Sequence, residues 1–271
     1  MIDENVFAEL QNKYIITNVG LKASDYENLD QLKKLGLATS ISTDETYNEI
    51  MESVGYINEF LEQVKLGGEI TLKGNIILKD YIEIPNEVII NLNGYDIIHP
   101  INSPSKDPDA FKVITGGKLT INGEGNVIAE NGYSIYAAGD SIVTINGGTY
   151  ISPVSSVYAK NHASVTINGG TFKVDGSKNP DGDFGQKYTL NLKDKVGNYT
   201  GDLSEIVVKG GKFYKYNPAA SESEPEVTNF VADGYESVKK GDYYIVSEIN
   251  DIIVDDNNWH VEYSPVTSIT S

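Results

Sequence analysis

The sequence predicts an all-β fold, a single-stranded parallel β-helix that forms a solenoid, and three observations predict it. An eight-residue motif recurs, as VTINGGTY at 143–150, as VTINGGTF at 165–172 and more loosely as IVVKGGKF at 206–213. Apolar and polar residues alternate within it, which is the periodicity of a strand with one buried face. Weaker copies recur roughly every 20 to 30 residues, a period typical of solenoids and too short for a helical-hairpin repeat.

The second position of the motif marks its register along the chain. We expect the marker residues to lie in one parallel stack, at Thr71, Asn91, Thr120, Thr144, Thr166, Thr189 and Val207. The alternative is a β-sandwich built from similar hairpins, but sandwich strands usually recur every 8 to 12 residues or so without a shared motif.

Coils that stack at the inter-strand distance of about 4.8 Å would place like residues on like. The expected inward apolar ladder contains Ile121, Ile145 and Ile167, with Leu190 also facing inward. The expected amide ladder contains Asn122, Asn146 and Asn168, and the expected aromatic ladder contains Tyr150, Phe172 and Phe213. The Asn-Gly-Gly segment supplies positive φ at a sharp corner, where a Cβ would be strained.

Residues 1–43 lack the repeat, and we interpret them as a separate attachment and oligomerisation region. Residues 44–66 are expected to form an amphipathic capping helix, since apolar residues fall on one face and Gly67 and Gly68 stop it. A helix just before the first coil would cover the open end of the apolar bore. In an oligomer its apolar stripe would instead pack on a symmetry mate.

The coils are expected to occupy 67–217, interrupted by two excursions. The segment 98–109 contains three prolines, and 175–183 is rich in glycine and aspartate, as is typical of loops. Residues 218–271 are expected to hold a capping hairpin at 235–246 and a tail that contains Trp259.

The charge balance excludes several classes of function. The 271 residues carry a formal net charge of −18, from 39 acidic and 21 basic side chains, and every base is a lysine. Without a basic stripe we expect no nucleic-acid partner and no anionic membrane partner. Cysteine is absent, which excludes disulfides and thiolate zinc sites. The first residues are acidic where a signal peptide is basic, so secretion by the usual route is not expected.

Cleavage of polysaccharides must be weighed, because parallel β-helices are the scaffold of pectate lyases, polygalacturonases and phage tailspike depolymerases. A lyase of that type needs a strong base, commonly arginine, and the chain has none. A hydrolase needs two carboxylates about 5 to 10 Å apart. The candidate pairs are Asp181 with Asp183 and Asp194 with Asp202, but nothing in the pattern places either pair on one coil face. We therefore expect no catalytic residue and no enzyme activity.

Metal binding has little support in the sequence. The oxygen-bearing residues that alternate like the opening of a calcium loop are Asp175, Ser177, Asn179 and Asp181. Pro180 stands where that loop requires glycine, and Gln186 replaces its closing glutamate. The three histidines are His99, His162 and His260, and no two of them are spaced as ligands of one metal ion would be. No metal or cofactor is expected.

Tyrosine is abundant, with 18 copies, and it suits both sugar stacking and protein interfaces. Tyr133, Tyr136 and Tyr158 follow corners rich in glycine and asparagine and are expected at the surface. Most others alternate with valine and isoleucine and are expected in the core. The pattern permits glycan binding but names no ligand-binding residue.

Three features of the sequence support one resemblance. They are the VTINGG coils, the segment GGEITL at 67–72 after a capping helix, and the closing NP at 217–218 followed by FVADGY at 230–235. Together they resemble the pectate-lyase-like β-helix modules in fibres of gut bacteriophages and in surface proteins of gut bacteria. The resemblance covers 67–246 and implies right-handed coils. The missing leader favours the phage group, and a short non-repeating N-terminus before a β-helix is similar to head fibres and decoration fibres, which dock on the capsid by the N-terminal part.

These observations lead to one interpretation and two alternatives. We expect a non-enzymatic virion structural protein, a head or capsid fibre on the capsid surface, assembled in the host cytoplasm. It should form a homo-oligomer through 1–43, a trimer first and a dimer second, with capsid proteins and host-surface polysaccharide as partners. The alternatives are a glycan-binding module of a bacterial surface adhesin and a polysaccharide-degrading tailspike-type enzyme.

Overall fold

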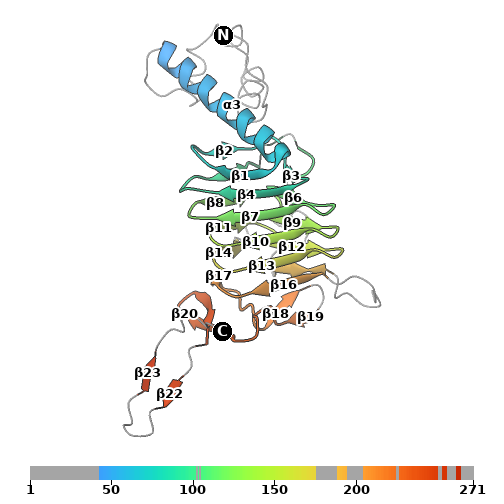
Figure 1. Ribbon diagram of the computed structural model, residues 1–271, viewed down its shortest axis with the longest axis vertical. Helices are drawn as coiled ribbons and strands as arrows, with labels where there is room; N and C mark the ends of the chain where they lie inside the picture. Colours follow the sequence, from blue (N-terminus) through green and yellow to red (C-terminus); the bar gives the residue numbers. More distant parts are fainter. Residues whose placement is uncertain are drawn as a thin grey trace.

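A computed structural model describes residues 43–101, 103, 105–174, 188–193, 204–223, 226–249, 252–254 and 261–263. Within these residues one α-helix precedes a column of short strands (Figure 1). Helix α3 spans Thr43–Leu66, one residue longer at its start than predicted. The predicted attachment region at 1–43 lies outside the described residues except for its last residue.

Three sheets, called A, B and C here, make up the column. Sheet A contains β1 (Gly68–Thr71), β4 (Glu87–Asn91), β7 (Lys118–Asn122), β10 (Ile142–Ile145), β13 (Ser164–Ile167) and β16 (Glu205–Val208). Sheet B contains β2 (Ile76–Ile77), β5 (Ile97–His99), β8 (Asn126–Ala129), β11 (Thr149–Ser152), β14 (Thr171–Val174), β17 (Gly211–Tyr214), β21 (Tyr243–Glu248) and β20 (Tyr235–Lys240). Sheet C contains β3 (Ile82–Ile84), β6 (Phe111–Val113), β9 (Ile135–Ala138), β12 (Val157–Lys160) and β15 (Leu190–Leu192). Two separate antiparallel pairs are β18 (Ser221–Ser223) with β19 (Glu226–Thr228) and β22 (Ile252–Val254) with β23 (Val261–Tyr263).

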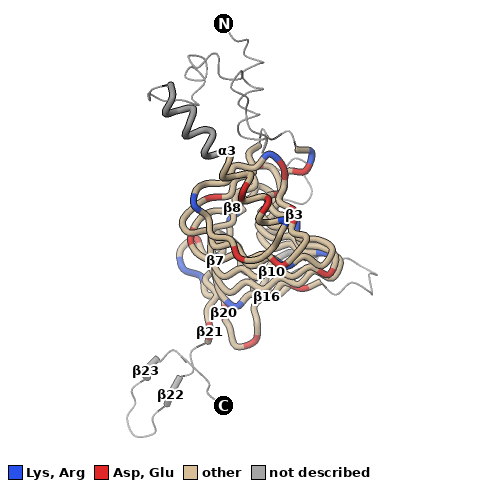
Figure 2. Tube along the Cα trace, turned by 45° about the horizontal axis from the view of Figure 1, so that its top comes forward, with Lys and Arg blue, Asp and Glu red and all other residues tan. Residues whose placement is uncertain are grey.

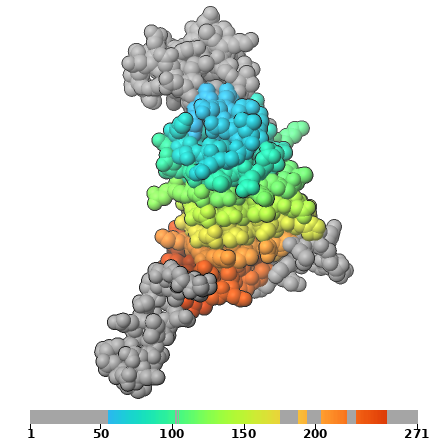
Figure 3. All heavy atoms as spheres, in the orientation of Figure 1, coloured from blue at the N-terminus to red at the C-terminus, as the bar shows by residue number. Residues whose placement is uncertain are grey.

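The chain visits sheets A, B and C in turn, so neighbouring strands of one sheet come from successive coils. Figure 3 shows the result, since the sequence colours follow one another as bands along the long axis. Every pairing among the strands of sheet A and of sheet C is parallel. The prediction of a mostly β, solenoid-like fold with parallel sheets is confirmed, and the hairpin pairing of a sandwich is absent from these two sheets.

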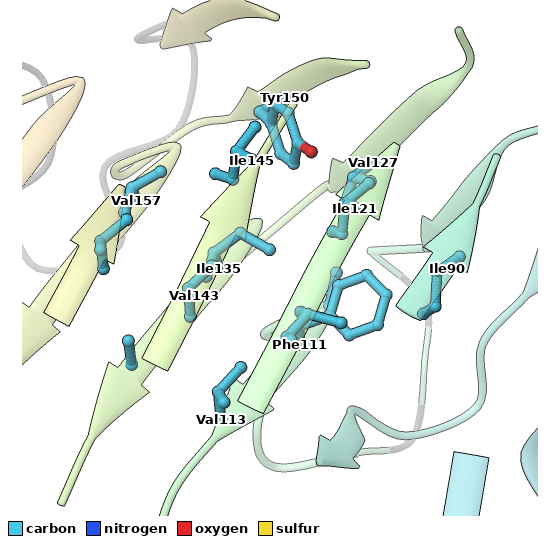
Figure 4. Close-up of a cluster of buried hydrophobic side chains, with 14 of the residues drawn as sticks. Ile90, Phe111, Val113, Ile121, Val127, Ile135, Val143, Ile145, Tyr150 and Val157 are labelled. Atoms are coloured by element: carbon cyan, nitrogen blue, oxygen red, sulfur yellow. The ribbon is translucent and has the colours of Figure 1, made fainter. Parts of the chain in front are cut away.

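The inward faces of the three sheets form one apolar core. Alternate residues of each strand point inside, because successive side chains of a strand lie on opposite faces. Ile90, Ile121 and Ile145 of sheet A are fully buried and lie in one cluster with Phe111 and Tyr150 (Figure 4). Lysine and acidic residues are distributed around the coils (Figure 2), and Asp109 is the buried exception among the described charged residues.

The predicted amide ladder is present on the outside of sheet A and is longer than expected. Asn168 Nδ2 donates to Asn146 Oδ1 at 2.8 Å, and Asn146 Nδ2 donates to Asn122 Oδ1 at 2.7 Å. Asn122 Nδ2 then donates to Asn91 Oδ1 at 2.9 Å. All three hydrogen bonds point toward the N-terminal end of the column, so each coil is tied to the coil before it.

The apolar and aromatic ladders are also confirmed. The adjacent partners in register are Ile121, Ile145 and Ile167. The ring centroids of Tyr150 and Phe172 are 5.0 Å apart, and those of Phe172 and Phe213 are 4.9 Å apart, with nearly parallel planes. Stacked rings at this spacing repeat the rise between coils.

The two glycines of each Asn-Gly-Gly corner meet two different requirements. The second glycine has positive φ, as predicted, for example 101° at Gly170. The first glycine permits close stacking of the coils. A Cβ on Gly169 would lie 2.7 Å from the carbonyl oxygen of Asn146, and a Cβ on Gly210 would lie 2.2 Å from that of Asn168. Each corner therefore rests on the backbone of the coil before it and leaves no room for a side chain.

The predicted register is wrong for the first two copies. Asn91 pairs with Asn122, so Ile89 and not Asn91 occupies the rank of the threonine markers. Thr71 is displaced in the same way, because it pairs with Asn91. The Asn-Gly at 93–94 has the same sequence as the start of the corner in the later copies. The asparagine that joins the amide ladder is Asn91, two residues earlier.

The predicted place of Thr189 is also wrong. It precedes β15, whose Leu190 pairs with Val157 in sheet C. In sheet A, Thr166 is followed directly by Val207. The sequence between β14 and β15 is longer than that between β11 and β12. One ordinary period after Thr166 therefore reaches the strand of sheet C and not the next strand of sheet A. Leu190 is nevertheless fully buried, as predicted.

Other structure packs against both ends of the stacked coils. Ile57, Phe60 and Val64 of helix α3 belong to the same buried cluster as the first coils. At the opposite end β21 pairs antiparallel with β17, and Val246 and Phe230 complete the cluster. The predicted hairpin at 235–246 is confirmed as β20 and β21, which pair antiparallel.

Candidate functional site

Sheet C presents an aromatic and basic outer face. Its inward positions are apolar, so Lys112, Tyr136 and Tyr158, which are partners in register on successive coils, point outward. Lys160 lies two residues after Tyr158 on the same face of β12. Tyr81 directly precedes β3. The name tyrosine–lysine face is used below for one set of residues: Tyr81, Lys112, Tyr133, Tyr136, Tyr158 and Lys160.

The rings of this face pack on one another. The Tyr133 and Tyr158 centroids are 4.8 Å apart with an interplanar angle of 12°. The Tyr136 centroid is 5.4 Å from that of Tyr158 and 6.1 Å from that of Tyr133. Tyr133 and Tyr136 are partly exposed, as the sequence predicted. Tyr158 is only 5% exposed, because neighbouring side chains cover the ring, and that prediction is wrong for this residue.

Two lysines lie over these rings. Lys112 Nζ is 4.8 Å from the Tyr81 centroid and 5.1 Å from the Tyr136 centroid. Lys160 Nζ is 5.3 Å from the Tyr136 centroid and 5.9 Å from the Tyr158 centroid. Each ammonium is within the range of a cation–π attraction. Tyr136 therefore lies between two positive charges.

The two lysines differ in their carboxylate partners. Lys112 forms an ion pair with Asp107, and its Nζ is 3.8 Å from Asp109 Oδ2. Burial lowers the pKa of Lys112, but the hydrogen bond and the charge of Asp107 outweigh it, so the pKa is raised. Lys160 forms no ion pair with any carboxylate that the structure describes. The charge of Lys112 is thus neutralised locally, whereas that of Lys160 is not.

Asp109 lies beneath the face and is 4% exposed. Burial raises the pKa of Asp109 to about 7; the hydrogen bond from the Tyr133 backbone N–H, 2.8 Å from Oδ1, lowers it and the charge of Asp107 raises it. Near neutral pH the Asp109 carboxyl group is therefore protonated for part of the time.

His99 connects the excursion at 100–110 to the core. The ring is fully buried, and Nδ1 is 2.5 Å from the carbonyl oxygen of Asp109. Because a carbonyl only accepts, Nδ1 carries the hydrogen of a neutral imidazole. Burial lowers the pKa of His99, against the raising effect of the Asp109 carbonyl. The excursion is also held by the hydrogen bond from Ile101 N to Glu130 Oε2, at 2.9 Å.

A groove adjoins the face at its N-terminal end, between helix α3 and β3. Its volume is about 580 Å³, and Tyr81 belongs both to its wall and to the tyrosine–lysine face. Leu61 and Glu83 line it from the helix and the strand. The Asn58 side-chain oxygen at this site is buried and has no hydrogen-bond partner among the described residues. The outer surface of sheet C is thus continuous with a recess under the helix.

The candidate residues that the sequence raised and set aside are mostly not described. The pairs Asp181 with Asp183 and Asp194 with Asp202, the loop at 175–186, His260 and Trp259 lie outside the described residues. His162 is exposed, with Nδ1 3.4 Å from Asp140 Oδ1. In the part of the chain that the structure describes, no three histidine or acidic side chains gather as a metal site would require.

Sequence reasoning missed the group formed by Asp107, Asp109 and Lys112. The residues lie within one short segment, DPDAFK at 107–112, which was interpreted only as the end of a loop. The one available signal is that Asp109 lies two residues before Phe111 and four before Val113, in phase with the apolar positions of a strand. A carboxylate at the buried phase of a strand pattern is a signal of an unusual environment.

No protein family, no curated protein and no solved structure matches this chain. Among the described residues no helix has the length and apolarity to cross a membrane. The arrangement itself offers ring faces and, at Lys160, an ammonium that pairs with no carboxylate among the described residues. These groups suit the binding of a polyhydroxylated ligand that carries negative charge.

Proposed function

We propose that the chain is a non-enzymatic structural protein of a bacteriophage particle, a head or capsid fibre. In this proposal a right-handed parallel β-helix forms the projecting shaft, and helix α3 caps its N-terminal end. Residues 1–43 anchor a homo-oligomer to capsid proteins at the capsid surface, after assembly in the host cytoplasm. The resemblance of the VTINGG coils to fibre modules supports the phage assignment.

One observation carries the structural part of the proposal. The buried core runs through all three sheets, residues of α3 belong to the same cluster as the first coils, and β21 pairs with β17 at the opposite end. A solenoid whose end coils are covered is stable as a spacer of fixed length, because each repeat needs only its neighbours and a cap. A shaft requires nothing further from the coils.

The carboxyl groups of Asp107 and Asp109, within the described coils, support a role without catalysis. Both lie beside Lys112 Nζ, and Asp109 is almost fully buried. Glycoside hydrolysis needs two carboxyl groups about 5 to 10 Å apart on either side of an accessible bond. With Asp109 beneath the surface, these two groups do not flank an accessible site for a sugar.

The test is to look for the chain in purified particles. Phage particles from the source culture would be banded by density and analysed by quantitative mass spectrometry, and an antibody raised against the coils would be located on them by immunogold electron microscopy. We expect the chain at a fixed number of copies per major capsid protein, with label on the head. Label on the bacterial envelope and none on particles would contradict the proposal and favour an adhesin.

The second candidate is a glycan-binding module of a bacterial surface adhesin, and the tyrosine–lysine face favours it. Partly exposed rings beside lysine side chains on one sheet are a feature that a plain spacer does not need. The third reading, a tailspike-type depolymerase, predicts shortened polysaccharide after incubation with the protein. We expect acidic and neutral bacterial polysaccharides to stay at full length by size-exclusion chromatography. Shortening that is lost on changing Asp181 and Asp183 to asparagine would contradict a non-enzymatic role.

A further inference from the structure

The tyrosine–lysine face runs along the axis of the column. Tyr81, Lys112, Tyr136 and Tyr158 come from four successive coils, and the last three are partners in register. Neighbouring parallel strands lie about 4.8 Å apart. On the first coil the residue in register with Lys112 is Glu83, and Tyr81 lies two residues before it on the same face. A linear ligand that lies along the axis would meet Lys112, Tyr136 and Tyr158 in turn, with Tyr81 beside Glu83 at the N-terminal end, whereas a ligand that lies across the axis would leave the face after one coil.

Tyr136 is the central contact of this face. It is partly exposed and has Lys112 on one side and Lys160 on the other, at 5.1 and 5.3 Å from its ring centroid. A tyrosine ring offers a flat apolar surface with a polar tip. The apolar C–H face of a sugar ring packs on such a surface, while the sugar hydroxyls hydrogen-bond at its margin.

Lys160 decides the charge of the ligand. Asp107 and Asp109 already neutralise Lys112, but no described carboxylate pairs with Lys160. The whole chain has a net charge of −18, so its long-range field repels an anionic polymer. A local ammonium at a partly buried position is the kind of group that overcomes this repulsion at short range.

From this juxtaposition we infer that the tyrosine–lysine face binds an extended oligosaccharide containing carboxylated sugars, with one sugar ring on Tyr136 and its carboxylate at Lys160 Nζ. The sugars before and after it lie toward Tyr81 and Tyr158. The inference gives a ligand class to the glycan contact proposed above. It does not depend on where the chain is located in a particle.

Binding would be measured on the purified full-length chain, so the result is independent of the particle test. The probes are immobilised oligosaccharides with glucuronate, galacturonate or sialate units, together with neutral oligosaccharides of equal length. Those that bind would then be titrated by calorimetry at low and high salt. We expect carboxylated probes to bind, neutral ones to bind at least tenfold more weakly, and added salt to weaken the binding of the carboxylated probes.

Matched variants assign the binding to this face. Lys160→Gln removes the ammonium and should weaken binding at least tenfold, and Tyr136→Ala should abolish it. The control is Lys173→Gln on sheet B, because Lys173 Nζ also lies over a tyrosine ring, 5.3 Å from the Tyr214 centroid. Circular dichroism would verify that each variant is folded, and Tyr136→Phe, which keeps the ring, should retain binding if Tyr136→Ala does not fold.

Three outcomes would overturn the inference. The first is that no carboxylated probe binds at millimolar concentration. The second is that neutral probes bind as well as carboxylated ones, which would remove the role of Lys160. The third is that Lys160→Gln and Lys173→Gln weaken binding equally, which would indicate general attraction to lysines rather than a site on sheet C.

Discussion

At the scale of the residue, the clearest constraint lies in the first glycine of each corner. Its φ is ordinary, so its need for a missing side chain comes only from the coil beneath it. At Gly210 a Cβ would lie 2.2 Å from the carbonyl oxygen of Asn168, a distance that real Cβ atoms do not reach. The coil would have to move away, and the hydrogen bond from Lys209 N to the Ile167 carbonyl, at 2.7 Å, would lengthen.

Gly210→Ala should therefore lower the free energy of unfolding by about 1 to 3 kcal/mol, the usual cost of overpacking. The control is Gly74→Ala, where the nearest atom to a new Cβ is 3.5 Å away on the Tyr56 ring. Urea unfolding followed by circular dichroism measures both. Equal stability of the two variants would indicate that the corners have more freedom than the structure allows.

Asp109 gives the second prediction at this scale. Its pKa is about 7 in the folded protein against an ordinary value of 3.8. The folded state therefore holds the proton more tightly than the unfolded state, and the stability gained is complete below about pH 4 and lost as the pH rises through about 7. Asp109→Asn keeps the oxygen that accepts from Tyr133 N but removes the titration.

We expect Asp109→Asn to become more stable relative to the natural protein between pH 5 and pH 8, as measured by melting temperature. His99, whose pKa burial lowers, titrates in both proteins and should cancel in the comparison. Asp233→Asn, at an exposed turn, is the control and should change little across the same range. A constant difference for Asp109→Asn would contradict a raised pKa.

At the scale of the element, helix α3 makes the sharpest prediction. Phe60 is fully buried in the cluster that includes the first coils. Phe60→Ala should cost about 3 to 5 kcal/mol if the column unfolds as one unit. In a solenoid the loss should also be local at first, so hydrogen exchange should accelerate in β1 and β4 before it does so in β13.

The control for this change is Glu59→Ala, which alters the exposed side of the same helix turn. Faster exchange in β1 and β4 for Phe60→Ala alone would support the role of α3 as a cap. Unchanged exchange in both variants would leave the first coil stable without the helix, and the capping role would be wrong.

The elements also separate what sequence predicts from what it does not. The ladders at 121–122, 145–146 and 167–168 were predictable because local alternation and the glycine corner agree there. The register near Asn91 was not, because two asparagines compete and only pairing across coils selects one. The position of Thr189 was wrong for a related reason, since the longer spacing between β14 and β15 puts a strand of sheet C where an ordinary period would put the next strand of sheet A.

The tyrosine–lysine face was predictable only in part. The surface tyrosines at 133 and 136 follow from their corners, but alternation within a strand says nothing about which outward residues of different coils become neighbours. Asp109 and Lys112 are close in the sequence, but Tyr81 and Tyr136, whose rings Lys112 lies over, belong to the coils before and after it. A fold in three dimensions, and not a spacing along the chain, brings the lysines over the rings.

At the scale of the whole molecule, assembly is the property to test. Each coil contacts its neighbours, and residues of α3 belong to the same buried cluster as the first coils, so we expect the coils to have no structural need of residues 1–43. Deleting 1–43 should leave a folded column by circular dichroism, convert a trimer to a monomer by light scattering, and prevent incorporation into particles.

Two results would contradict this prediction. A truncated chain that remains trimeric would place the subunit contacts on the coils themselves. A truncated chain that still decorates particles at normal occupancy would place the attachment elsewhere, with the tail around Trp259 as the next candidate. A dimer in place of a trimer for the full chain would change the symmetry but not the role of the N-terminal region.

The one-way amide ladder has a consequence for how such a molecule changes size. Each asparagine donates to the coil before it across a step of 22 residues in the most regular part, and the chain of donors ends where Asn91 Nδ2 meets the Glu69 carboxylate at 2.7 Å. A duplicated segment of one full step therefore finds every donor and acceptor ready, whereas an insertion inside a strand of sheet A would shift the asparagine out of line. An insertion between strands leaves the ladder intact, as the step of 31 residues from Asn122 to Asn91 shows. The column can lengthen or shorten in whole coils only, which makes the reach of the protein a quantity that duplication or loss of a single repeat adjusts in fixed increments.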